Sequence, residues 1–291
     1  MRRKATFILC FGASAIVVAQ PVRTASASAG GRHQGTAMSQ PAPNTLTANE
    51  RAGGWRLLFD GKTASGWRGY RQQTLPAGWQ AIDGALTRVG QAGDIVTLNE
   101  FGDFELTLEW KLVSNGNSGV FYRVVEDDPV MWHMAPEYQI IDNAYKEPLK
   151  PGQYAGANYD LDPPSRDATK PIGSWNQTRL LVRGAHVEHW LNGVKVVEYE
   201  LWTPDWERRI RESKFRDFPS YGRARRGHIG LQDHGDNVAF RNIKIRLYSV
   251  FYFDLVQAVR PARTTAELPR SSRWPRTRAG TRRHARQLDQ P

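Results

Sequence analysis

Alternation of apolar and polar residues is the feature that most constrains how this chain can fold. In residues 104–111 the even positions hold Phe, Leu, Leu and Trp, and the odd positions hold Glu, Thr, Glu and Lys. Side chains of a strand point alternately to opposite faces of its sheet, so this pattern predicts a half-buried antiparallel strand.

Seven further segments are predicted as strands, at 118–125, 137–141, 178–183, 186–191, 194–199, 227–232 and 238–247. Asn192-Gly193 joins two of them and is a strong hairpin signal. Residues 204–213 alone favour a helix, because Pro204 suits the first turn and acidic residues follow it. Many strands and almost no helix predict an all-β sandwich or jelly roll of antiparallel sheets.

The net charge of +11 lies at the two ends of the chain. Residues 1–29 carry +4 and residues 250–291 carry +6, which leaves +1 for the body between them. A basic surface on the body is therefore not predicted, and we expect no nucleic-acid partner.

The first segment, residues 1–29, has the pattern of a signal peptide. Three basic residues precede the apolar stretch 5–19, and Ala-x-Ala sites follow it. We expect export to the periplasm or the outside of the cell, with an uncleaved membrane anchor as the alternative. The apolar stretch is too short to cross a bilayer, so no stable membrane span is expected in the mature protein.

The rest of the chain divides into three predicted parts. Residues 30–49 form a flexible linker, residues 50–248 form the β-sandwich domain, and residues 249–291 form a basic, disordered tail. Cys10 is the only cysteine and lies inside the predicted signal peptide. The mature protein would have neither a disulfide nor a thiol nucleophile.

Eight motifs, taken in order, resemble the 3-keto-disaccharide hydrolase family over about residues 53–248. They lie at 54–67, 102–106, 117–123, 137–142, 170–176, 189–193, 227–235 and 240–245. The resemblance implies a concanavalin-A-like jelly roll of two curved antiparallel sheets that holds a sugar. It also implies a hydrolase that cleaves glycosides already oxidised to a ketone at sugar C3.

Strand alternation gathers polar residues on one face of three motif strands. Glu137 and Gln139 share a face, and Arg123 is expected on the face of its own strand that carries Gly119 and Phe121. On a third strand His228, Gln232 and His234 share a face. If these faces coincide, they form a patch of carboxylate, amide and imidazole groups that suits the hydroxyls of a sugar.

Each candidate residue has a possible role. The catalytic candidates are Glu137, Asp142 and His234, and the substrate-binding candidates are Arg123, Gln139, Trp132, Tyr154, Asp160 with its neighbour Tyr159, and Gln232. Glu137 or His234 would be the base, Arg123 or Gln232 would donate to an enolate oxygen, and Asp142 would deliver a proton or orient the substrate. Structural roles compete with these: Asp142 could cap a turn, and Arg123 could simply pair with Glu137.

Several functions remain open at this point. On a 3-keto sugar a base would remove the C2 proton, the enolate would expel the group at C1, and water would then add. The conventional alternative uses two carboxylates, Glu137 and Asp142, on an unoxidised sugar. A non-catalytic carbohydrate-binding module and a structural or adhesion domain are the other classes. No cofactor motif and no motif-defined metal site occurs, although a scattered Asp/His/Glu site stays open.

Overall fold

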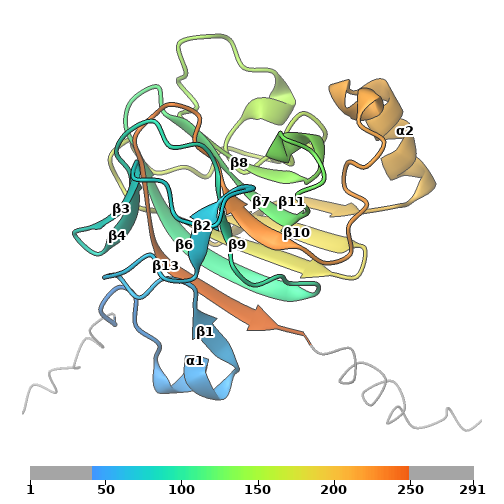
Figure 1. Ribbon diagram of the computed structural model, residues 1–291. Coiled ribbons are helices and arrows are strands. Elements are labelled where there is room, and N and C mark those ends of the chain that lie inside the picture. Colours follow the sequence, from blue (N-terminus) through green and yellow to red (C-terminus); the bar gives the residue numbers. More distant parts are fainter. Residues whose placement is uncertain (1–40, 249–291) are drawn as a thin grey trace, which may run out of the picture. The chain divides into compact units, whose positions relative to one another are not determined.

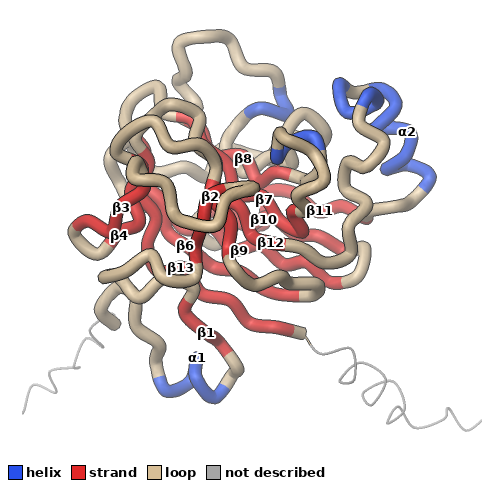
Figure 2. Tube along the Cα trace, in the orientation of Figure 1, coloured by secondary structure: helices blue, strands red, loops and turns tan. Residues whose placement is uncertain are grey.

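The computed structural model describes residues 41–248, and Figures 1 and 2 show them as two layers of strands. The predicted signal peptide, most of the predicted linker and the predicted tail lie outside the described residues. Within residues 41–248, none of the helices is long and apolar enough to cross a membrane.

The larger sheet has eight strands. Seven follow the order β11-β10-β9-β6-β13-β4-β3, and β1 pairs with β13 off this path. All pairings are antiparallel. The strands are β1 (Trp55–Leu57), β3 (Trp79–Ile82), β4 (Ala85–Arg88), β6 (Phe104–Leu112), β9 (Asn176–Arg183), β10 (His186–Leu191), β11 (Val194–Glu200) and β13 (Val238–Leu247).

The smaller sheet has five antiparallel strands in the order β2-β5-β12-β7-β8. They are β2 (Trp67–Gly69), β5 (Ile95–Thr97), β7 (Asn117–Val124), β8 (Glu137–Ile141) and β12 (His228–Leu231). The two layers confirm the predicted all-β jelly-roll sandwich of the concanavalin-A-like kind.

In the described part of the chain, helices are few and short, as predicted. They are α1 (Ala48–Ala52), α2 (Pro204–Glu212) and the 3-10 helices η1 (Met131–His133), η2 (Pro151–Gln153) and η3 (Lys214–Asp217). The side chain of Thr203 caps α2 by accepting from the Trp206 N–H. The end of the predicted linker contacts the sandwich, because Asn44 donates to the Gly84 carbonyl and accepts from the Asn242 N–H.

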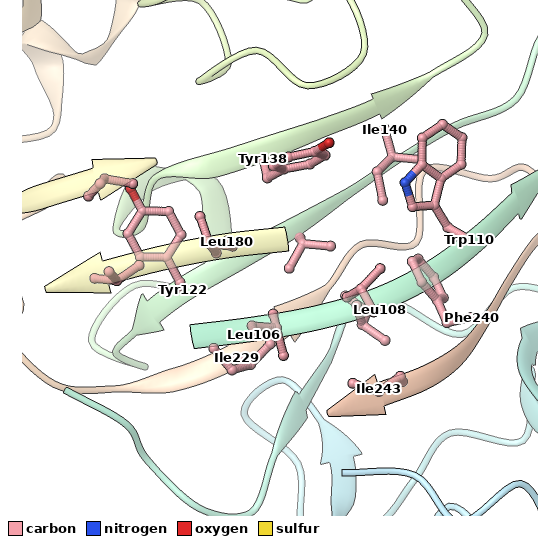
Figure 3. Packing of buried hydrophobic residues seen from close by; sticks show 14 of the residues in the cluster. Leu106, Leu108, Trp110, Tyr122, Tyr138, Ile140, Leu180, Ile229, Phe240 and Ile243 are labelled. Atoms are coloured by element: carbon pink, nitrogen blue, oxygen red, sulfur yellow. The ribbon is translucent and has the colours of Figure 1, made fainter. Parts of the chain in front are cut away.

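The core lies between the two sheets. The even positions of β6 are at most 3% exposed, as the alternation predicts. In Figure 3, Leu106, Leu108 and Trp110 of the large sheet pack with Tyr138 and Ile140 of the small sheet. Since the inward faces of β7 and β8 are used for this packing, their alternate residues must point to the outer face of the small sheet.

All eight strands predicted from alternation are present, and none of their ends differs from the observed end by more than two residues. The five strands β1 to β5 were not predicted. Each has only three or four residues, which is too short for alternation to show. Asp83-Gly84 joins β3 to β4 with φ values of 49° and 74°, a turn conformation that matches the twist of a hairpin.

Strand β7 contains a bulge that changes the face on which Arg123 lies. Ile229 of β12 lies opposite two residues of β7, Tyr122 and Arg123, and Arg123 has a φ of 54°. An extra residue in one strand reverses the alternation beyond it. The prediction that Arg123 shares a face with Gly119 and Phe121 is therefore wrong.

Arg123 instead joins the two sheets. Its guanidinium donates to the carbonyls of Gly102 (3.1 Å) and Gly184 (2.9 Å) and pairs with Asp103 (3.0 Å). The guanidinium carbon lies 5.4 Å from the ring centroid of Trp202. Asp103 precedes β6, and Gly184 lies in the turn between β9 and β10, so Arg123 of the small sheet is held by the ends of large-sheet strands.

Replacing Arg123 with Met should destabilise the fold and spare the chemistry. The Arg123 side chain is only 3% exposed. Its loss leaves two carbonyls and one carboxylate without their hydrogen-bond donor, which should lower the free energy of unfolding by about 2–4 kcal/mol. Urea unfolding measures this, and the exposed Arg56→Met is the matched control. Unchanged stability together with lost turnover would instead place Arg123 in the site.

Candidate active site

A pocket of about 240 Å³ lies on the outer face of the small sheet. Its lining residues are Asn117, Trp132, Glu137, Gln139, Tyr159, Lys214, Gln232 and His234. The structure thus brings together five of the residues proposed from the sequence: Trp132, Glu137, Gln139, Gln232 and His234. Tyr159, named from the sequence as the neighbour of Asp160, joins them.

Glu137 lies over a glycine of the neighbouring strand. Gly119 of β7 is paired with Gln139, and Phe121 is paired with Glu137. A Cβ atom at Gly119 would lie 2.2 Å from Oε1 of Glu137 and 2.8 Å from its Cδ. Only a residue without a side chain leaves this space, so Gly119 allows the carboxylate to lie back over the sheet.

A loop covers the free edge of β8 and supplies Tyr159. The Gln139 N–H donates to the Ala157 carbonyl (3.0 Å), and the Gly156 N–H donates to the Gln139 carbonyl (2.9 Å). The Tyr159 N–H donates to the Glu137 carbonyl (3.0 Å). This pairing protects the sheet edge and places Tyr159 beside Glu137.

The helices η1 and η3 provide the aromatic wall. Met131 packs over Gly230, where an added Cβ would lie 2.5 Å from its sulfur, and this contact seats η1 on the sheet. The next residue, Trp132, packs edge-on against Phe218 at 5.1 Å between ring centroids. The ammonium of Lys214 lies 4.3 Å from the ring centroid of Trp132 and 4.2 Å from that of Tyr159.

The electrostatics of the pocket centre on Glu137. Its pKa is raised to about 8, mainly by burial; the ammonium of Lys214 opposes this shift, and the carboxylate of Asp94 adds to it. Within residues 41–248 the carboxylate has no hydrogen-bond donor, so protein dipoles do not replace its lost hydration. Burial lowers the pKa of Lys214, although part of this side chain is exposed to solvent. The Glu137 carboxylate and the Lys214 ammonium thus line the same pocket, and the pKa of each is shifted from its ordinary value.

Three amide side chains of the pocket have unused acceptors. The Oδ1 of Asn117 and the Oε1 atoms of Gln139 and Gln232 are buried and have no hydrogen-bond partner among residues 41–248. The backbone of Gln232 is held firmly, because its N–H donates to the Gly119 carbonyl (3.0 Å) and its carbonyl accepts from Ser118 (2.8 Å). Buried acceptors without donors cost free energy, and a ligand rich in hydroxyls would satisfy them.

Three further candidates from the sequence lie outside this pocket, in addition to Arg123. Asp142 accepts from the backbone N–H groups of Asn115 and Ala144, both at 2.9 Å, so it has the turn-capping role that was the alternative for it. Tyr154 follows η2 as its C-terminal cap and is not among the residues that line the pocket. Asp160 lines a neighbouring pocket.

Sequence analysis missed two pocket residues, Asn117 and Lys214. Asn117 lies two residues before Gly119 in β7, so strand alternation alone would have placed both side-chain positions on the same, outer face. Lys214 begins a 3-10 helix directly after α2, and no periodic pattern places its ammonium beside Trp132.

One cluster on the large sheet has the composition of a metal site. The ligand atoms of His186, Glu188 and Glu198 lie within 4.8 Å of one another. Lys195 already forms ion pairs with both glutamates, and Arg179 lies 3.5 Å from Glu188. These cations neutralise the carboxylates, so the cluster is accounted for as a surface ion-pair network.

Comparisons with known proteins agree with the sequence motifs. The family described as "3-keto-alpha-glucoside-1,2-lyase-like domain" matches residues 54–246. A protein of Bacteroides thetaiotaomicron named 3-keto-disaccharide hydrolase is 35% identical over 230 residues, which are 67% of this chain and 79% of that protein.

Two solved structures from Parabacteroides distasonis are also similar, and both are described as candidate glycosyl hydrolases. The first is 36% identical with a TM-score of 0.67 and covers 72% of this chain and 100% of its own. The second is 31% identical with a TM-score of 0.54 and covers 67% of this chain and 99% of its own. The similarity extends over the whole sandwich that carries the pocket.

Glu137→Gln should stabilise the protein in a pH-dependent way. The carboxyl has a pKa of about 8 when folded and an ordinary value of 4.5. Ionisation therefore opposes folding between these values, and the advantage of Gln should grow from about pH 4.5 to pH 8 and then level off, at about 2–5 kcal/mol.

Urea unfolding across this pH range measures the difference from wild type. The exposed Glu147→Gln is the matched control and should follow wild type at every pH. A gain for Glu137→Gln that does not change with pH would contradict the raised pKa.

Proposed function

The chain belongs to the 3-keto-alpha-glucoside-1,2-lyase-like domain family, and from this premise we propose that it hydrolyses the glycosidic bond of 3-keto-disaccharides and related 3-keto-glycosides. The similarity to a 3-keto-disaccharide hydrolase supports a glycoside hydrolase. The single observation that carries the finer proposal is the buried Glu137 carboxylate, which has no hydrogen-bond donor in the described part of the chain and lies in a pocket of unsatisfied amide oxygens.

Glu137 acts as the base in this proposal. A ketone at C3 makes the C2 proton acidic, and Glu137 removes it. A carboxylate of ordinary pKa is a weak base, whereas a pKa of about 8 brings the proton affinity close to working pH. Burial therefore supplies the base strength that the first step needs.

Lys214 stabilises the enolate. When the C2–H bond breaks, its electron pair forms the C2–C3 double bond and the ketone oxygen becomes negative. The ammonium of Lys214 is the positive charge at the pocket wall, and it replaces Arg123, which the sequence had suggested for this task. A cation placed where charge develops lowers the barrier more in a partly buried site than in water.

Elimination and hydration complete the reaction. The enolate re-forms the ketone, a C1–C2 double bond forms, and the C1–O bond breaks. The leaving oxygen takes a proton from an acid, for which His234 at the pocket is the candidate. Water then adds its hydroxyl to C1, Glu137 returns the proton to C2, and the second proton of water restores the acid. The sum is hydrolysis of the glycoside.

The two-carboxylate mechanism has less support from the pocket. Glu137 is the one carboxylate among the eight residues that line it. Asp142, the expected second member of the pair, is engaged by two backbone N–H groups in a turn. An elimination that needs one base and one cation fits this composition better than acid–base attack by paired carboxylates.

Cleavage of a 3-keto-disaccharide, compared with its parent disaccharide, tests the proposal. We expect only the keto compound to be cleaved, with a primary isotope effect when C2 carries deuterium. The kcat/KM should rise with pH with an apparent pKa near 8, because Glu137 must be ionised to act. Glu137→Gln should lower kcat at least about 100-fold. Cleavage of the parent alone would reject the elimination, and binding without turnover would indicate a carbohydrate-binding module.

Gly119→Ala should lower turnover while the fold is kept. The added methyl group meets the flexible end of Glu137, so the carboxylate can move away at little cost in stability. A displaced base should reduce kcat about 100-fold. The control is Gly90→Ala, whose methyl group meets nothing within 4 Å. Full activity of Gly119→Ala, with an unchanged melting temperature, would show that the position of Glu137 does not matter.

A further inference from the structure

A second and larger pocket adjoins the candidate active site and shares Lys214 with it. Its volume is about 560 Å³. Four cations, Lys150, Arg209, Lys214 and Arg216, and two acids, Asp160 and Glu212, are among its lining residues. We name it the cationic pocket because positive side chains outnumber negative ones.

We propose that the cationic pocket binds an acidic substituent, a carboxylate, sulfate or phosphate, on the leaving half of the substrate. This inference rests on the proposed function and adds the charge class of the group that is released at C1. It assigns the pocket a task that the neutral amides of the active site cannot perform.

The positive charge of the pocket is available to a ligand. Within residues 41–248, Lys150 and Lys214 have no carboxylate oxygen within 4.0 Å, and Arg216 has only a long contact of 3.8 Å with the exposed Asp217. Three cations of the pocket therefore lack a close ion-pair partner among the described residues. Unpaired cations that converge on one hollow attract an oxyanion more strongly than paired ones.

The other charged residues of the cationic pocket are Arg209 and Glu212, which have ion-pair partners, and Asp160. Arg209 is bound by Asp162 and by Asp205 (2.9 Å) and serves as a fixed wall. Glu212 is paired with Arg208 at 2.6 Å, so its negative charge is partly compensated. Asp160 alone opposes the three free cations, and it leaves the pocket with a net positive charge.

The relative position of the two pockets assigns the acidic group to the leaving half. The active-site pocket of about 240 Å³ is smaller than pockets that hold drug-sized ligands, so it suits a single sugar ring. Lys214 forms a wall common to both pockets. With the 3-keto ring beside Glu137, a substrate that continues past Lys214 places its second unit in the cationic pocket.

The test compares 3-keto-disaccharides that share one glycosidic bond and differ only in the leaving sugar. The leaving sugar is neutral, a uronate, a 6-sulfate or a 6-phosphate, so the arms also identify the preferred anion. We expect kcat/KM for at least one acidic substrate to exceed the neutral value about ten-fold at low salt, and the preference to shrink as NaCl is added.

The double variant Lys150→Gln/Arg216→Gln should lower the acidic-over-neutral ratio of kcat/KM at least five-fold. The matched control Arg56→Gln/Lys62→Gln makes the same charge change at exposed positions that line neither pocket, and it should keep the wild-type ratio. Equal loss in both double variants would mean that overall charge, and not this pocket, sets the preference, and it would overturn the inference.

Failure of this inference is distinguishable from failure of the proposed function. Hydrolysis of the neutral 3-keto-disaccharide without preference for any acidic one overturns the cationic pocket and leaves the hydrolase standing. If no 3-keto substrate is cleaved, calorimetry with glucuronate, glucose 6-sulfate and glucose 6-phosphate tests whether the cationic pocket binds an acidic sugar. Binding that the Lys150→Gln/Arg216→Gln variant loses supports the pocket, and no binding to wild type overturns it.

Discussion

The Glu137 carboxylate can lie over the small sheet only because the adjacent residue of β7, Gly119, has no side chain. This close approach removes water from the carboxylate while no hydrogen-bond donor of the described domain replaces it, and the pKa rises to about 8 as a result. The other pocket residues are arranged around this group. The sandwich therefore holds a carboxylate in a state that the unfolded chain could not maintain.

The packing between the two sheets stabilises the fold, and the outer face of the small sheet carries the candidate active site. Inward residues such as Leu108 and Tyr138 fill the space between the sheets, and this packing positions β7 and β8. The outer face of the small sheet then carries groups whose hydrogen-bonding needs the fold does not meet, such as the free oxygens of Gln139 and Gln232. A stable core carries the cost of these unsatisfied groups, which are the ones that a sugar would use.

A loop and two 3-10 helices supply further pocket residues, including the positive charge of Lys214. The loop along the edge of β8 brings Tyr159, η1 brings Trp132, and η3 brings Lys214. Contact with two aromatic rings holds the Lys214 ammonium at the boundary between the active-site pocket and the cationic pocket. A positively charged residue in this position can act on both halves of a substrate, which links the chemistry to the choice of leaving group.

The sequence by itself determined the fold class, the eight longer strands and the outer face that carries Glu137 and Gln139, because a two-residue period records which side of a strand is buried. Only the tertiary structure decided the position of Arg123, since a bulge reverses alternation without leaving a sequence signal. It also decided that Asp142 caps a turn and that Lys214 faces Glu137. Periodicity describes one strand at a time, whereas a site depends on how loops and non-adjacent segments pack against that strand.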